Sequence, residues 1–113
     1  MAGPATVLCL YRVQRSKEEE FRKLLKTHWK TLQRRGLVTN DPTRVWRGEE
    51  HDTGGPIWVE MFTWKDGDTP NRAHEIPEVM AIWEPMGGCC ESRGGKPAME
   101  FPHVAPVDLG IRG

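Results

Sequence analysis

The spacing of hydrophobic positions predicts a strand followed by a helix in the first third of the chain. Residues 5–14, ATVLCLYRVQ, form an apolar, β-branched run with a polar end, which is typical of a strand covered on both faces. Ser16 and Glu19 then match a helix-capping box, and Gly36 marks the end of the predicted helix. The apolar stripe of this helix consists of Phe21, Leu24, Leu25, His28 and Leu32.

The rest of the chain alternates between strand and helix patterns. Residues 43–50 predict a short second strand, and PIWVEMFTW at 56–64 is the strongest strand pattern in the chain. The cluster KDGDTPN at 65–71 predicts a turn. Residues 74–86, HEIPEVMAIWEPM, predict a second helix. Residues 98–104 predict a last strand, whose internal proline favours a sheet edge or a bulge.

The element order β-α-β-β-α-β predicts a ferredoxin-like α+β domain, with an antiparallel sheet and two helices on one face. A length of 113 residues fits a single domain over 1–113, with a core at about 5–105. The tail from residue 105 reads as irregular, or it could reach across to a partner. Because the second face of the sheet also carries apolar residues, we expect a homodimer that closes sheet to sheet into a dimeric α+β barrel.

Charge and composition narrow the classes of function. Sixteen basic and sixteen acidic side chains cancel and no basic stretch stands out, which argues against a nucleic-acid partner. No run of about 18 apolar residues predicts a membrane span, and the N-terminus lacks the basic region of a signal peptide. Cys9, Cys89 and Cys90 make a poor disulfide framework, so we expect a reducing, cytoplasmic location.

The third predicted strand and the turn after it resemble the antibiotic biosynthesis monooxygenase family of dimeric α+β barrels. The residues that carry the resemblance are Trp64, Lys65 and Asp66 at the strand end and His74 ten residues later. The resemblance implies the dimeric barrel fold and a superfamily of oxygenases, heme-degrading enzymes and other members. Quinone-forming oxygenases of the family are similar in having a tryptophan at this strand end, here Trp64, and a polar residue shortly before it, here Glu60. The polar residue is an amide in such an oxygenase, so the carboxylate of Glu60 departs from the family's pattern.

The heme-degrading branch of the family fits this chain poorly. Its members are similar in using an asparagine on the first strand, where this chain has Cys9 or Tyr11. They also use a histidine beyond the start of the second helix, and His74 comes too early for that role. We therefore expect no heme cofactor from the resemblance.

Glu60 is the first candidate for chemistry, because strand alternation surrounds it with aromatic rings. Ile57, Val59, Met61 and Thr63 are expected to face one way, and Trp58, Glu60, Phe62 and Trp64 the other. A carboxylate among rings is expected to have a raised pKa unless a cation or hydrogen-bond donor pairs with it. The functional interpretation is a general acid or base. The structural one is a salt bridge to Arg12, Arg44 or Arg47.

Three histidines are further candidates. His28 lies within the apolar stripe of the first helix, so its ring is expected to point inward, as a core histidine or a functional one. His74 falls opposite the apolar stripe of the second helix unless the regular helix begins near Pro77, which would leave His74 in a separate turn over a pocket mouth. His103 could face the cavity or the dimer interface.

Metal and redox chemistry receive less support. His28, Glu60, His74 and His103 would suffice as ligands for one metal ion, yet none of them forms a local pair such as HxxxH. Cys89 and Cys90 lack CxxC spacing, which favours packing or exposed thiols over redox chemistry.

The leading hypothesis is an enzyme similar to the cofactor-independent monooxygenases, acting on a small aromatic or polyketide-like substrate in an apolar cavity between sheet and helices. Glu60 or His74 is the expected base, with Trp64 and His28 as hydrogen-bond donors. The expected substrate-binding residues are Trp58, Phe62, Met80, Trp83 and His103. The alternatives are a non-catalytic small-molecule-binding or structural dimer, and a metal- or heme-dependent enzyme that uses the histidines.

Overall fold

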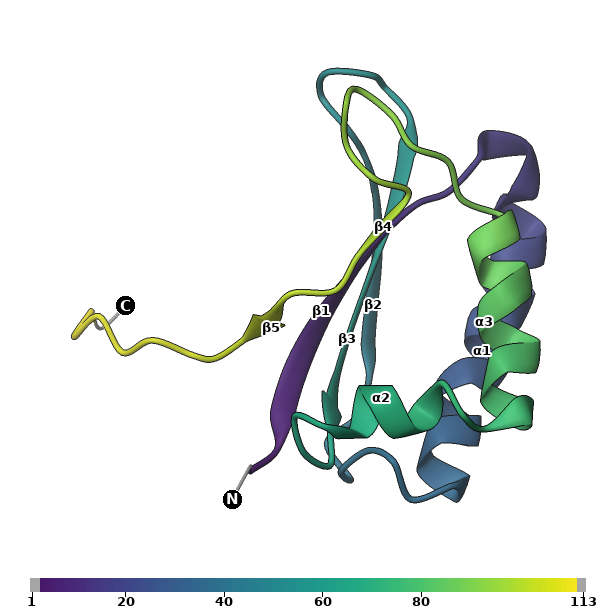
Figure 1. Ribbon diagram of the computed structural model, residues 1–113. Coiled ribbons are helices and arrows are strands. Elements are labelled where there is room, and N and C mark those ends of the chain that lie inside the picture. Colours follow the sequence, from purple (N-terminus) through teal and green to yellow (C-terminus); the bar gives the residue numbers. More distant parts are fainter. Residues whose placement is uncertain (1–2, 112–113) are drawn as a thin grey trace.

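A computed structural model describes residues 3–111 and contains the predicted elements in the predicted order (Figure 1). The elements are β1 (Ala5–Arg12), a 3-10 turn (Arg15–Lys17), α1 (Glu18–Arg34), β2 (Arg44–Glu49), β3 (Pro56–Trp64), α2 (Thr69–Ala73), α3 (Pro77–Gly88), β4 (Met99–Glu100) and β5 (His103–Val104). The α+β class and the βαββαβ order are confirmed, and α2 is an additional short helix.

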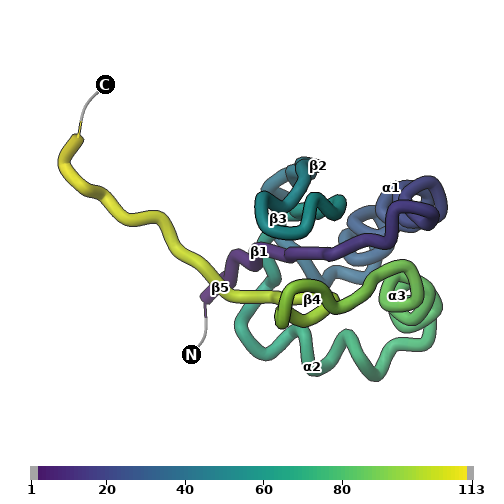
Figure 2. The backbone as a smooth tube through the Cα atoms, turned by 90° about the horizontal axis from the view of Figure 1, so that it is seen from above, coloured from purple at the N-terminus to yellow at the C-terminus, as the bar shows by residue number. Residues whose placement is uncertain are grey.

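The sheet has the order β2-β3-β1-β4, and β5 also pairs with β1. All of these strand pairs are antiparallel, and β1 and β3 run side by side along their whole length from Ala5–Trp64 to Arg12–Ile57. Figure 1 shows α1 and α3 together on one face of the sheet, as the sequence predicted, with α2 near one end. The C-terminal segment leaves the body on the opposite side, a path that Figure 2 shows from above.

The two faces of the sheet differ in burial, because β3 alternates between buried and half-buried residues along all nine positions. Its buried face, beneath the helices, carries Trp58, Glu60, Phe62 and Trp64, as predicted. The opposite face is apolar but only half-buried or exposed in the single chain, and we call it the open face. Its apolar residues are Leu8, Leu10, Trp46, Ile57, Val59 and Met61.

Several local predictions were wrong. Ser16 does not cap α1, because the chain forms a 3-10 turn there and α1 begins at Glu18 without a side-chain cap. The expected turn at 65–71 is present over 65–68, but its last three residues belong to α2, where Asp66 binds Thr69 through its side chain. The last strand is split in two at Phe101 and Pro102, since a proline nitrogen has no proton to donate to the ladder.

A buried ion cluster ties the loop before β4 to the sheet. Glu50 accepts from Arg12 Nε at 3.0 Å and from Arg93 Nη1 at 3.0 Å, and all three side chains are largely buried. Arg93 also donates to the backbone carbonyls of Val13 and Pro56. Burial alone would lower the pKa of Arg12, but its hydrogen bonds to Glu50 and Glu100 outweigh burial and raise it. This cluster keeps the chain in place where it returns to the sheet as β4.

Candidate functional site

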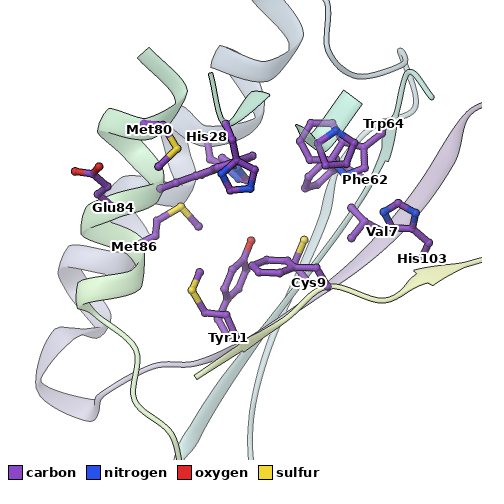
Figure 3. A pocket seen from close by; sticks show the side chains of 15 residues that line it. Val7, Cys9, Tyr11, His28, Phe62, Trp64, Met80, Glu84, Met86 and His103 are labelled. Atoms are coloured by element: carbon purple, nitrogen blue, oxygen red, sulfur yellow. The ribbon is translucent and has the colours of Figure 1, made fainter. Parts of the chain in front are cut away.

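A cavity of about 310 Å³ lies between the helix-covered face of the sheet and helices α2 and α3 (Figure 3). Its wall is mainly aromatic and sulfur-containing, formed by Cys9, Phe62, Trp64, Met80, Met86 and Met99. Polar atoms reach it from Tyr11, His28, His74, Trp83, Glu84 and His103. The volume is at the small end of the range for sites that enclose a compact organic ligand.

Glu60 is the centre of a buried hydrogen-bond network behind this wall. The Tyr11 hydroxyl donates to Glu60 Oε1 at 2.7 Å. The Nδ1 atom of His28 lies 3.1 Å from each carboxylate oxygen of Glu60. The Trp83 indole N–H donates to His28 Nε2 at 2.8 Å. Glu60 is only 1% exposed and reaches the cavity through Tyr11 and His28, which both line it.

Local sequence patterns explain why these side chains meet. Strand alternation turns Tyr11 on β1 and Glu60 on β3 toward the helices. The apolar stripe of α1 carries His28 down onto the sheet, which confirms that its ring points inward. Trp83 comes from α3, and Figure 3 shows the Tyr11 hydroxyl directed into the cavity.

The network determines where its protons lie. An indole nitrogen can only donate, so His28 Nε2 must be the acceptor and carry no proton. The proton of the neutral imidazole is therefore on Nδ1, which donates to Glu60. Glu60 thus accepts from two neutral donors, His28 and Tyr11.

Burial and the negative charge of Glu60 perturb the neighbouring acids. Burial, followed by the charge of Glu60, raises the pKa of the Tyr11 hydroxyl well above its usual value. The same two causes raise the pKa of the Cys9 thiol far above its usual range. Both groups are therefore neutral at ordinary pH, and Tyr11 keeps the proton that it donates to Glu60.

The structure places His74 and His103 at the cavity rather than in the buried network. His74 follows α2, and the regular helix α3 begins at Pro77, so His74 belongs to a separate turn as expected. Its exposed ring meets the Trp83 ring edge-on, with 4.8 Å between the ring centroids. His103 lies on β5, pairs with Val7 in the backbone register and lines the opposite edge of the cavity.

Other expected residues lie in different places. Phe62, Trp64 and Met80 line the cavity, but Trp58 does not. The Trp58 indole donates to Glu18 Oε1 at 2.8 Å, and its ring packs against Phe21. Trp58 lies there because its end of β3 is beneath the start of α1. The arginines considered as partners of Glu60 face elsewhere: Arg12 binds Glu50, Arg47 binds Glu18, and Arg44 is exposed.

Sequence reasoning missed Tyr11 as part of the site, and it missed the cavity residues Met86, Met99 and Phe101. A signal for Tyr11 was available, since it shares a strand face with Cys9, which stands opposite Glu60 in the β1–β3 ladder. Met99 and Phe101, in the last strand and at its split, had no comparable signal, because their register depends on the fold.

Neither a metal centre nor a membrane segment emerges from the part of the chain that the structure describes. Residues 3–111 contain no cluster of three or more histidine, cysteine, aspartate or glutamate side chains that could hold a metal ion. Over the same residues, no helix has the length and apolar character needed to cross a membrane. Cys89 and Cys90 are buried free thiols at the end of α3, and burial raises their pKa values to about 11 and about 12.

Comparison with known proteins gives relatives by structure alone. No protein-family model matches the chain, and no curated protein matches it significantly. The cofactor-independent oxygenase SnoaB of Streptomyces nogalater, in a mutant form, is 17% identical with a TM-score of 0.63 over 97% of this chain and 100% of its own. A candidate antibiotic biosynthesis monooxygenase from Nitrosomonas europaea is 9% identical, with a TM-score of 0.66 over 96% and 95%.

A third similar structure is a dimeric ferredoxin-like protein of unknown function from Jannaschia sp. CCS1. It is 11% identical, with a TM-score of 0.64 over 92% of this chain and 100% of its own. Sequence identities this low establish a common fold and leave activity open. This chain therefore has the ferredoxin-like fold of the antibiotic biosynthesis monooxygenase-like proteins, as its sequence predicted.

Proposed function

We propose that this chain is a homodimeric, cofactor-independent monooxygenase that acts on a small phenolic or polyketide-like ring. The observation that carries the proposal is the pair of His28 and Glu60, a buried histidine and carboxylate whose imidazole lines an apolar cavity. The fold shared with SnoaB, a cofactor-independent oxygenase, supports the same class of reaction.

The pair supplies a base at the cavity wall. His28 lines the cavity with Nε2 as its basic nitrogen, and Glu60, which accepts from Nδ1, would stabilise the imidazolium formed when a substrate proton is taken up. This differs from the roles expected from the sequence, where Glu60 or His74 was the base and His28 a donor. Glu60 acts here through His28, because it has no direct access to the cavity.

The proposed reaction balances without a cofactor. Loss of a proton leaves an electron-rich substrate anion, which transfers one electron to dioxygen. The resulting radical and superoxide combine into a peroxide, and cleavage of its O–O bond converts a ring CH₂ group into a carbonyl. One dioxygen and one substrate thus give one ketone or quinone and one water. The aromatic and methionine walls of the cavity would keep water away from the anion.

The homodimer is supported by the open face of the sheet. Its apolar side chains lie half-buried or exposed in the single chain, and Trp46 is 49% exposed. A second copy packed sheet to sheet would remove this apolar surface from water. The similar protein from Jannaschia is described as dimeric.

Oxygen uptake with an anthrone, which carries a ring CH₂ group, tests the proposal. We expect oxygen consumption matched by formation of the quinone. Glu60→Gln should lower kcat by about 100-fold or more, the usual contribution of a positioned base. The amide nitrogen of the glutamine is a donor and would face the His28 Nδ1–H or the Tyr11 O–H. One of these two donors would then lose its acceptor, and the negative charge behind His28 would be gone. His51→Ala, in an exposed loop, is the matched control and should behave as the unaltered protein.

His74→Ala separates the two candidate bases. We expect a smaller effect than that of Glu60→Gln, because His74 is exposed and has no carboxylate behind it in the network. Loss of oxygen uptake in His74→Ala with full activity in Glu60→Gln would assign the base to His74. Equal rates in all of these variants would contradict base catalysis at this cavity.

A non-catalytic binding dimer is the second candidate, and one observation favours it. Glu60 is fully paired by Tyr11 and His28, as a structural carboxylate would be. This function predicts saturable binding of the aromatic compound with no oxygen uptake. An absorption spectrum and metal analysis of the purified protein test the third candidate, since a Soret band or stoichiometric metal would favour a heme- or metal-dependent enzyme.

A further inference from the structure

The hydrogen bond between Trp83 and His28 occupies the atom that the proposed chemistry needs. The Trp83 N–H donates to His28 Nε2 at 2.8 Å, so the lone pair that would accept a substrate proton is already in use. Resting on the proposed function, we infer that Trp83 and His28 form a receptor for one ligand hydroxyl, which inserts between the two nitrogens. The ligand would be a phenol or an enol.

The proton inventory of the site supports this assignment. His28 Nδ1 donates to Glu60, which leaves Nε2 with a lone pair and no proton. Trp83 has one proton and no lone pair available for hydrogen bonding. A hydroxyl is therefore complementary to the pair, because its oxygen accepts from Trp83 while its proton points at His28. An ether oxygen can accept from Trp83 but has no proton for His28.

Tyr11 adds a second constraint on the ligand. Its hydroxyl proton is committed to Glu60 at 2.7 Å, so the Tyr11 oxygen can only accept from the cavity. Burial and the charge of Glu60 raise the pKa of Tyr11, which keeps that proton in place. At this end of the cavity, Tyr11 and His28 thus offer a ligand two hydrogen-bond acceptors, and Trp83 offers one donor. This arrangement favours ligands that donate hydrogen bonds.

Insertion also gives Trp83 a role in the reaction. Once His28 has taken the hydroxyl proton, the ligand oxygen is negative and the Trp83 N–H donates to it. A hydrogen bond to the charged form of an acid lowers its pKa. Insertion requires the Trp83 ring to shift away from His28; this ring is only partly buried and has edge-on contacts with Trp64 and His74.

The test uses nitrophenol and its methyl ether, nitroanisole, under nitrogen so that no oxidation takes place. Equilibrium binding to the unaltered protein should favour nitrophenol about tenfold or more, since the ether leaves His28 Nε2 without a donor. Absorbance of the yellow phenolate then reports ionisation of the bound ligand. This first comparison needs no variant and does not depend on how a variant folds.

Trp83→Phe removes the indole N–H and keeps a ring. We expect bound nitrophenol to ionise about one pH unit higher in this variant, because the phenolate loses its donor. The affinity for the neutral ligand should change little, since the lost bond from Trp83 is offset by a vacant His28 Nε2. Trp29→Phe is the matched control, because the Trp29 N–H is buried without a hydrogen-bond partner and does not line the cavity.

The outcomes separate this inference from the proposed function. Tighter binding of nitrophenol with a Trp83-dependent ionisation supports the hydroxyl receptor, whether or not the protein consumes oxygen. Equal affinity for the two compounds, or binding of neither, overturns it. The same ionisation in the unaltered protein, Trp83→Phe and Trp29→Phe also overturns it, even if oxygen uptake is observed with an anthrone.

Discussion

The partners of Glu60 are neutral hydrogen-bond donors rather than cations, and this determines whether the carboxylate can take part in chemistry at the cavity. A salt bridge to an arginine would have made it a purely structural residue. Its partners are instead Tyr11 and His28, whose other edges line the cavity. At the scale of single residues, the site is therefore a chain of hydrogen bonds from Glu60 to the cavity wall.

Truncation of Glu60 is expected to cost stability as well as activity. Glu60→Ala leaves the Tyr11 O–H and the His28 Nδ1–H without partners in the core, which should lower the free energy of unfolding by about 3 kcal/mol. Glu75→Ala, at an exposed position, should change it by less than about 0.5 kcal/mol. Urea denaturation followed by tryptophan fluorescence measures both, and equal midpoints would contradict the network.

Buried acids predict loss of stability at alkaline pH. The folded-state pKa values of Cys9 and Tyr11 are raised, and those of Cys89 and Cys90 are raised to about 11 and about 12. An unfolded thiol ionises near pH 8.5, so the unfolded chain loses protons that the folded chain retains. The contribution of these four groups to stability should be constant below about pH 8 and decrease as the pH rises through 9 to 11.

Cys90→Ala tests the alkaline prediction at one position. The free energy of unfolding should fall less steeply with pH in this variant, by up to about 1.4 kcal/mol per pH unit for the missing thiol. Urea titrations at a series of pH values measure the slope. An identical slope in the variant and the unaltered protein would show that Cys90 ionises equally in both states.

Elements with a clear period were predicted well, and elements that depend on distant contacts were not. β3 has the predicted bounds, and α1 ends before Gly36, whose φ of 71° favours glycine. α2 and the split of the last strand were missed: Asp66 and Thr69 start α2 locally, Pro102 interrupts the strand, and the place of the two short strands along β1 depends on distant pairing. The loop between α3 and β4 is one such case, since its place depends on Arg93 reaching Glu50.

Arg93→Ala tests the contribution of the ion cluster to this element. Removal of the cation leaves Glu50 buried with Arg12 as its main remaining partner, and we expect a loss of about 3 kcal/mol. Hydrogen exchange at Lys96 N–H, which bonds to the Arg93 carbonyl, should accelerate. Arg15→Ala removes an exposed pair with Glu49 and should cost less than about 1 kcal/mol. Similar effects of the two substitutions would contradict a structural role for the cluster.

At the scale of the whole molecule, helices cover one face of the sheet, and within residues 3–111 the apolar side chains of the other face along β1 to β3 stay half-buried or exposed. Val107, Leu109 and Ile111 are 77%, 74% and 79% exposed and lie on the segment that leaves from the open side (Figures 1 and 2). That this segment reaches a partner stays a prediction.

Leu10→Glu is expected to disrupt the dimer. The substitution places a charge on the open face beside Val59, where a second copy would bury it. Analytical ultracentrifugation should show a dimer for the unaltered protein and a monomer for this variant. Ala81→Glu, at an exposed position of α3 on the helix side, should remain dimeric. A monomer for the unaltered protein, or a dimer for Leu10→Glu, would contradict the sheet-to-sheet arrangement.

The sequence by itself determined the fold class, the order of the elements and the face that each strand residue takes. These follow from short-range periods, two for β3 and about 3.6 for α1, which any single segment carries. For the same reason the sequence predicted that Glu60, Phe62 and Trp64 share a face and that the His28 ring points inward.

Only the tertiary structure decided which of these residues meet. Glu60 and His28 are 32 positions apart, and His28 and Trp83 are 55 apart, so no local pattern relates them. Their distances depend on how α1 and α3 lie on the sheet, and the same packing placed Trp58 away from the cavity and Tyr11 at its wall. Hydrogen-bond geometry is sensitive to shifts of a few tenths of an ångström, and side-chain packing across the whole domain sets it.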